Sequence, residues 1–251
     1  MKRQLIIVAV VALWLARPGL PAADDLRDPA AGAAIEPRPG AQVPAAAMFA
    51  DETGKEVQLG DYLGGPPVIL APVYYTCPNL CGSTLADLAA VLRRVPLTPG
   101  SDYRFVAVSI DPRERPADAA RAKARALAAA APPALAANIH LLTGADAPVK
   151  SLMQAIGFRY RWDEELQQYT HLAGIGVLTG DGRLARWLPG IGLEPADLRL
   201  AIADTGRGGI AGLADSFLLL CSHYDPQTGR YTPVVTGILK IAGVLTVVAL
   251  A

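Results

Sequence analysis

The sequence contains little cysteine and no excess of either charge, and both deficits narrow the class of protein. Only three cysteines occur in 251 residues, so no framework of several disulfides can hold the fold together. Lys and Arg together number 23, as do Asp and Glu. With no net charge, the chain has neither the excess of positive charge that attracts nucleic acid nor the excess of negative charge that attracts a cationic partner. The sequence also lacks internal repeats and a glycine-rich phosphate-binding loop.

The N-terminal end has the pattern of an export signal followed by a tether. Met1-Lys2-Arg3 is a short basic start, and the apolar run from Leu5 to Ala16 is too short to span a bilayer. We interpret residues 1–23 as a secretory signal peptide, with an uncleaved anchor as the alternative. Residues 24–47 are rich in Ala, Pro, Gly and charged residues, and we predict that they form a flexible linker.

The C-terminal end is also apolar. Residues 232–251 are long enough to span a membrane, although Lys240 would cost about 2.5–3.5 kcal/mol at the bilayer centre. We predict a C-terminal transmembrane helix here, with an amphipathic or buried helix as the alternative. Residues 207–231 would then form a membrane-proximal segment. Its Cys221 and His223 could bind a metal weakly, or they could be ordinary residues beside the membrane.

The part between these ends, residues 48–206, alternates strands with helices. Apolar runs predict buried strands, and apolar residues spaced three and four apart predict helices. A hairpin is expected over 48–59, strands over 68–75, 104–110, 139–142, 172–178 and 184–188, and helices over 85–95, 116–130, 145–156 and 195–203. This order predicts an α/β sandwich built on a mixed central sheet.

One motif at a strand–helix junction dominates the domain, Cys77-Pro78-Asn79-Leu80-Cys81. Residues four apart on a helix have Cβ atoms roughly 5–6 Å apart, which lets two sulfurs converge on one soft metal ion. A disulfide needs Cβ atoms about 3.5–4.5 Å apart, which is closer than helical spacing allows. A Cys77 that lies outside the helix could approach Cys81 to this distance. The positive end of the helix dipole favours thiolate. The pair could therefore hold a metal, cycle between thiol and disulfide, or do both, and a purely structural disulfide is the simplest alternative.

Three features together resemble the SCO/SenC family of thioredoxin-fold copper chaperones for cytochrome c oxidase. A strand ends in Tyr-x-x-Cys-Pro-x-x-Cys, the next strand ends in Val-Ser-Ile-Asp-Pro, and a lone His171 precedes an apolar strand and a Thr-Gly-Asp-Gly turn. The resemblance covers about residues 48–206 and implies a thioredoxin-like sandwich. The residues around the two cysteines, Tyr75-Thr76, Asn79 and Gly82, depart from those common in the family.

The resemblance implies a site and a role for this chain. Cys77, Cys81 and His171 match the family's copper ligands, a soft set suited to Cu(I), with Cu(II) also accepted. The implied function is that of a metallochaperone rather than an enzyme. It would receive copper from an upstream donor and deliver it to the dinuclear site of cytochrome c oxidase subunit II. The expected location is the inner membrane, with the domain facing the periplasm and no role for nucleic acid.

Other interpretations stay open at this point. The same cysteines could serve a membrane-anchored thiol–disulfide reductase, which would have no obvious use for His171. Zinc would need a fourth ligand, which only the distant Cys221 or His223 could supply. Asp111, the family's Asp-Pro residue, could lie near the copper or simply cap the following turn. His140 has no context that indicates a ligand.

Overall fold

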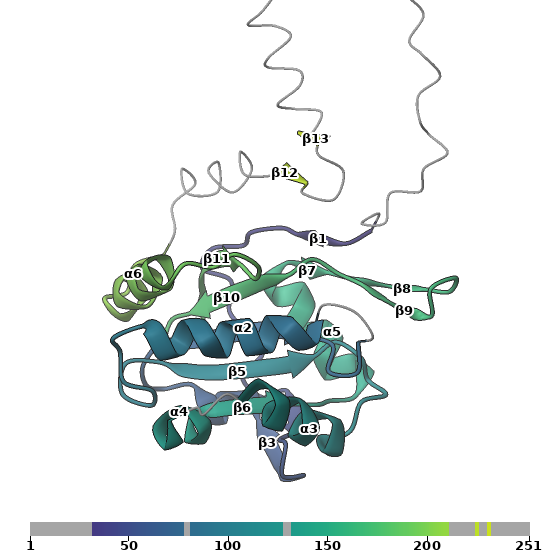
Figure 1. Cartoon of the computed structure of the whole chain (residues 1–251), viewed down its shortest axis with the longest axis horizontal. Helices are drawn as coiled ribbons and strands as arrows, with labels where there is room; N and C mark the ends of the chain where they lie inside the picture. Colours follow the sequence, from purple (N-terminus) through teal and green to yellow (C-terminus); the bar gives the residue numbers. More distant parts are fainter. Residues whose placement is uncertain (1–31, 78–80, 128–131, 211–223, 226–229, 232–251) are drawn as a thin grey trace, which may run out of the picture. The chain divides into compact units, whose positions relative to one another are not determined.

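A five-stranded mixed sheet forms the centre of the structure, a computed structural model (Figure 1). The structure describes residues 32–77, 81–127, 132–210, 224–225 and 230–231, with only the backbone of 81–84, 224–225 and 230–231. The strand order is β11-β10-β4-β5-β6. Strands β4, β5 and β6 are parallel, whereas β10 runs antiparallel to both β4 and β11. Their bounds are β4 Val68–Val73, β5 Arg104–Ser109, β6 Ile139–Leu142, β10 Gly174–Leu178 and β11 Leu184–Pro189.

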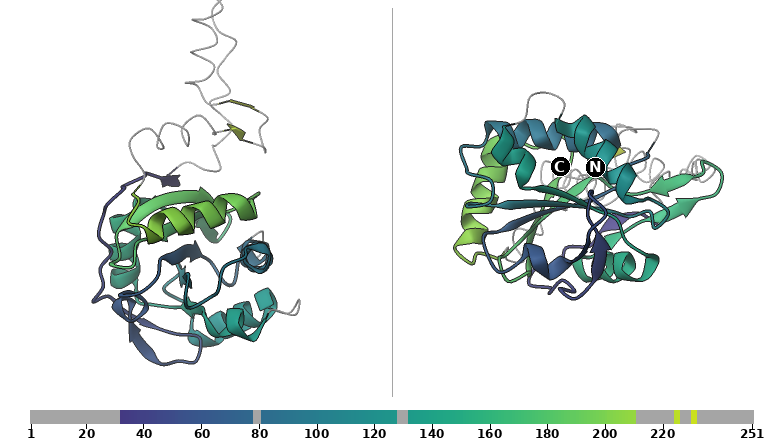
Figure 2. Two further views of the ribbon diagram at one scale, coloured as in Figure 1. Left: turned by 90° about the vertical axis from the view of Figure 1, so that its left-hand side faces the viewer. Right: turned by 90° about the horizontal axis from the view of Figure 1, so that it is seen from below.

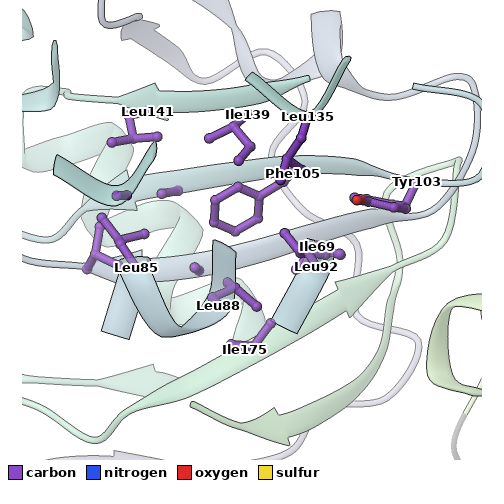
Figure 3. Packing of buried hydrophobic residues seen from close by; sticks show 14 of the residues in the cluster. Ile69, Leu85, Leu88, Leu92, Tyr103, Phe105, Leu135, Ile139, Leu141 and Ile175 are labelled. Atoms are coloured by element: carbon purple, nitrogen blue, oxygen red, sulfur yellow. The ribbon is translucent and has the colours of Figure 1, made fainter. Parts of the chain in front are cut away.

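Four helices cover one face of this sheet. They are α2 Cys81–Arg94, α3 Pro116–Leu127, α4 Pro133–Ala137 and α6 Pro195–Gly206. Leu85, Leu88 and Leu92 of α2 lie at helical spacing and pack with Ile69 and Phe105 of the sheet in one buried cluster (Figure 3). Side chains alternate along a strand, so β4 and β5 contribute every second residue to this cluster. The short helix α4, which follows Pro132, is not among the elements predicted from the sequence.

The opposite face is covered by α5 and by the N-terminal part of the domain (Figure 2). Helix α5 spans Asp146–Ile156, the predicted hairpin consists of β2 Met48–Ala50 and β3 Glu56–Gln58, and the 3-10 helix η1 spans Leu59–Tyr62. Both faces are therefore covered, which explains why the central strands read as continuous apolar runs. Helix α5 ends as predicted at Ile156, and the next residue, Gly157, has a left-handed φ of 74° that favours glycine.

Short strands extend the domain beyond the central sheet. Strand β7 Phe158–Arg159 follows α5, and β8 Arg161–Asp163 pairs with β9 Gln168–Thr170 as a hairpin. Strand β1 Ala34–Ile35 pairs antiparallel with β7. The prediction of a flexible linker over 24–47 is therefore corrected for its second half. Residues 34–35 are held by strand pairing. Val43, 2% exposed, belongs to a second buried cluster, which lies on the opposite face of the sheet from the first and includes Leu70, Val106, Leu152 and Phe158.

The topology and the two covered faces confirm the mixed, thioredoxin-like α/β sandwich. The predicted signal peptide, residues 1–23, and the predicted transmembrane helix, residues 232–251, lie outside the described residues. No helix within the described ranges is both long enough and apolar enough to cross a membrane. In the predicted membrane-proximal segment, β12 Tyr224–Asp225 pairs with β13 Arg230–Tyr231.

Candidate metal centre

Three segments that carry predicted site residues meet at one edge of the sheet. Cys77 follows the carboxyl end of β4, and Asp111 follows that of β5, its parallel neighbour. His171 precedes the amino end of β10, which is antiparallel to β4 with Gly176 opposite Leu70. The ring centroid of Tyr169, two residues before His171, lies 5.8 Å from that of Tyr74, three residues before Cys77. The fold thus brings together two segments that lie almost 100 positions apart in sequence.

Cys77 lies in a tight turn between β4 and α2. The turn spans residues 74–77 and is closed by the Cys77 N–H, which donates to the Tyr74 carbonyl at 3.3 Å. The Cys77 side chain is a half-buried free thiol that packs against the second cluster. Cys81 is the first residue of α2, so Cys77 lies outside the helix. The side chain of Cys81 lies outside the described part of the chain.

A backbone hydrogen bond fixes the orientation of the His171 ring. Its Nδ1 lies 3.0 Å from the Leu172 carbonyl oxygen, which can only accept, so Nδ1 carries the proton and Nε2 is the basic nitrogen. Burial lowers the pKa of His171, against the opposing effect of that hydrogen bond. Neutral imidazole is the form that binds metals, and a backbone carbonyl on the other nitrogen is the usual way to orient such a ligand.

Asp111 is occupied by an ion pair. Its carboxylate accepts from Arg113 Nε at 2.9 Å and Arg113 Nη2 at 2.9 Å, and also from the Arg113 backbone N–H. Asp111 is buried, whereas the Arg113 side chain is 57% exposed. Both carboxylate oxygens are thus engaged within the turn after β5. This geometry favours the interpretation of Asp111 as a turn-capping residue over a role near the copper.

The guanidinium of Arg113 also contacts the β8–β9 hairpin. Its Cζ lies 4.1 Å from the Trp162 ring centroid, a cation–π contact. Tyr169 on the paired strand contacts Trp162 and Tyr74 with ring centroids 5.1 Å and 5.8 Å apart. An open pocket of about 340 Å³ lies here, and its walls include Tyr74, Thr76, Arg113 and Trp162. The hairpin therefore forms one side of the surface next to Cys77.

Sequence reasoning missed one residue of this region, Glu114. It is 7% exposed, and its carboxylate accepts the N–H of Tyr75 at 3.0 Å and the N–H of Thr76 at 2.5 Å. Burial raises the pKa of Glu114, while hydrogen bonds from Ser109, Thr76 and Tyr75 act in the opposite direction. The parallel ends of β4 and β5 place the loop 111–115 at this edge, but nothing in the sequence indicates where its side chains point.

The predicted ligand set is only partly covered by the described side chains. Cys77 and His171 both pack against the second cluster, since the His171 ring contacts Phe158. Among the side chains that the structure describes, no three of His, Cys, Asp and Glu converge as a metal site. The side chain of Cys81 and the whole of Cys221 and His223 fall outside the described part of the chain. His140 lies on β6 against the Tyr62 ring, in a different part of the second cluster.

Comparison with known proteins connects the chain to one family. Residues 36–204 match the family model described as SCO1/SenC. No curated protein matches the chain significantly. Among solved structures, a candidate electron transfer protein from Aquifex aeolicus VF5 is 22% identical with a TM-score of 0.59, covering 68% of this chain and 95% of its own.

Two further structures come from named Sco proteins. Arabidopsis thaliana ScoI with copper bound is 19% identical with a TM-score of 0.53, covering 70% of this chain and 99% of its own. BsSco, a member of the Sco family of cytochrome c oxidase assembly proteins with an identified disulfide switch, is 17% identical with a TM-score of 0.52. It covers 70% of this chain and 94% of its own. At these identities the likeness establishes a common fold.

Proposed function

The chain belongs to the SCO1/SenC family, and from this premise we propose that it is a copper metallochaperone for cytochrome c oxidase assembly. In this proposal Cys77, Cys81 and His171 bind the copper, which is cargo rather than a permanent cofactor. The recipient is the dinuclear copper site of oxidase subunit II, and an upstream donor supplies the metal. The domain faces the periplasm from the inner membrane.

The observation that carries the proposal is the placement of Cys77 and His171 at one edge of the sheet. A half-buried thiol and a neutral imidazole both pack on the same cluster there, next to a second cysteine at a helix start. Two thiolates and an imidazole suit Cu(I), which accepts three soft ligands without a fourth. The copper bound in Arabidopsis thaliana ScoI supports the same assignment.

A second function is a thiol–disulfide reductase, favoured by the position of Cys77 outside α2 and of Cys81 at its first residue. A thiolate of the pair would attack a client disulfide, form a mixed disulfide and release one client thiolate. The other cysteine would then release the second client thiolate and leave this chain with the disulfide. The disulfide switch identified in BsSco is consistent with such a couple.

Metal analysis of the purified protein tests the two functions against each other. The reduced protein, loaded with Cu(I) and desalted, should retain stoichiometric copper, and the oxidised protein should retain none because metal and disulfide compete for the same sulfurs. Reversible oxidation of two thiols without copper retention in either state would reject the metallochaperone and leave the reductase.

A further inference from the structure

We infer that Glu114 is a positioning residue of this site: it fixes the turn that presents Cys77. The inference rests on the proposed function, because Cys77 is a ligand or a redox group only there. Glu114 would not contact the copper. It would act through the backbone of the two residues that precede Cys77.

The first step of the argument is the geometry of the turn. With the Cys77 N–H bonded to the Tyr74 carbonyl, the N–H groups of the two central residues, Tyr75 and Thr76, need another acceptor. The Glu114 carboxylate provides one oxygen for each, Oε2 for Tyr75 at 3.0 Å and Oε1 for Thr76 at 2.5 Å. A single buried carboxylate thus satisfies both central amides of the turn that leads into Cys77.

The second step is that Glu114 is itself held firmly. The Ser109 hydroxyl donates to Glu114 Oε2 at 2.5 Å, and the Glu114 N–H donates to the Asp111 carbonyl at 3.1 Å. Ser109 is fully buried and ends β5, where it is the register partner of Val73 at the end of β4. The carboxylate therefore connects the turn to the buried ends of two neighbouring central strands, β4 and β5.

The third step is that the same turn is anchored from its other side. Arg125 Nη2 of α3 donates to the Tyr75 carbonyl at 3.1 Å. The Tyr75 hydroxyl lies 3.1 Å from the Ala107 carbonyl oxygen and 3.0 Å from that of Leu142. Tyr75 is thus fixed by hydrogen bonds at its N–H, its carbonyl and its hydroxyl. Glu114 also fixes the next residue, because its carboxylate accepts the Thr76 N–H. Partners that orient a ligand in this way typically change metal affinity about 10- to 100-fold when removed.

A purely structural anchor would explain the same contacts, and the chain offers a matched control for it. Glu52 is also a largely buried carboxylate that accepts a backbone N–H, that of Leu141 at 3.0 Å, and a side-chain donor, Lys123 Nζ at 2.5 Å. Its hydrogen bonds tie the β2–β3 hairpin to β6 and α3 rather than to the backbone of residues 74–77, although, besides burial, its charge also raises the pKa of Tyr75. Loss of either carboxylate should lower stability, but only Glu114 should affect the site.

The test compares the parent protein with Glu114→Gln, Ser109→Ala and Glu52→Gln. Each is measured for Cu(I) affinity by competition with a chromogenic chelator, for the Cu(II)–thiolate absorption band, and for denaturant unfolding. We expect Glu114→Gln to weaken Cu(I) binding about tenfold or more and to shift the absorption band. Ser109→Ala should produce a smaller change of the same sign. Glu52→Gln should change only unfolding.

Parental affinity and spectrum in folded Glu114→Gln would overturn the inference, as would an equal loss in Glu52→Gln. If Glu114→Gln does not fold, Ser109→Ala decides by the same criteria. If the parent itself binds no copper, the proposed function fails, and the variants are compared in their thiol–disulfide equilibrium with glutathione. A change in that equilibrium constant of about tenfold, some 30 mV for two electrons, in Glu114→Gln alone would uphold the positioning role, and an unchanged constant would overturn it.

Discussion

The aromatic ring of Phe158 lies against the imidazole of His171, with ring centroids 6.1 Å apart and planes inclined by 46°. Phe158 is the first residue of β7, immediately after the left-handed Gly157 that ends α5. It also stacks on Trp187 of β11 at 5.9 Å. The position of the predicted histidine ligand, between β9 and β10, is therefore also set by the residue that follows helix α5 on the second face of the sheet.

Replacement of either motif cysteine should abolish copper retention. In Cys77→Ser or Cys81→Ser a hydroxyl replaces one of two thiolates, and hydroxyl is a poor ligand for Cu(I). Stoichiometric copper in the desalted parent and its absence in both variants is the expected result, measured by metal analysis. Cys221→Ser is the matched control and should retain copper. Undiminished Cu(I) affinity in both motif variants would end the ligand assignment.

His171→Ala should weaken copper binding while leaving the redox couple intact. The imidazole is proposed as a ligand and has no part in bonding between the two sulfurs. Cu(I) competition should show weaker binding, and thiol titration after mild oxidation should still show that Cys77 and Cys81 form a disulfide. His140→Ala is the control, because its side chain packs elsewhere, against Tyr62. Parental copper binding in His171→Ala would make His171 structural and strengthen the reductase interpretation.

Gly157→Ala should be much more destabilising than Gly54→Ala, although both glycines have a left-handed φ, of 74° and 90°. The backbone conformation alone costs a non-glycine residue about 1–2 kcal/mol. At Gly157 an added Cβ would lie 1.9 Å from the Glu36 carbonyl oxygen, whereas at Gly54 it would meet nothing within 4 Å. Overpacking should add about 1–3 kcal/mol at Gly157.

Denaturant unfolding of both glycine variants provides the measurement. Because Gly157 precedes Phe158, its variant should also show weaker copper binding than Gly54→Ala. Equal losses of unfolding free energy in the two variants would contradict the close approach of Glu36.

Protonation of His140 should lower the free energy of unfolding in mild acid. Burial lowers its pKa below the ordinary 6.5. Glu52 and Asp51 act to raise the pKa, and Lys123 and Arg104 act to lower it. With a depressed pKa the folded state binds the proton less readily than the unfolded state does. The unfolding free energy should therefore be unaffected above pH 6.5 and decrease as the pH falls below it.

The comparison is between the parent and His140→Gln, unfolded in denaturant from about pH 8 to about pH 5. The variant should lose less stability over the acid part of this range. His171 has a pKa shifted in the same direction, and it is present in both proteins, so its contribution cancels in the difference. Parallel stability curves for parent and variant would show that His140 titrates alike in both states.

Residues 232–251 should hold the mature protein in the membrane. About 20 helical residues at 1.5 Å each match a hydrocarbon core of roughly 30 Å, and the long side chain of Lys240 can reach toward the headgroups. A chain ending at Arg230 should be soluble and still bind copper, since the proposed ligands all precede that point. Full-length mature protein in the soluble periplasmic fraction would refute the anchor. Loss of copper from the shortened chain would contradict a copper site that is complete without residues 231–251.

Local patterns in the sequence determined the elements of the domain and the setting of its cysteines. The apolar runs at β4 and β5 and the leucine spacing of α2 each depend on neighbours within a few residues, because strand and helix periodicities are local properties. The junction of β4 with α2 at Cys77 and Cys81 follows from the same signals. The mixed sheet also followed, since parallel strands need crossover helices and an antiparallel pair needs only a tight turn.

Only the tertiary structure decided what surrounds Cys77. Three tertiary contacts join residues 38 to 125 positions apart, in loops or strands too short to show a periodicity. Strand β1 pairs with β7, and Arg113 lies over Trp162. The Glu114 carboxylate accepts the N–H groups of Tyr75 and Thr76. A buried carboxylate is stable only where donors converge on it, and such convergence arises when the sheet and its covering helices have packed. The sequence contains the residues for these contacts, but packing alone selects their partners.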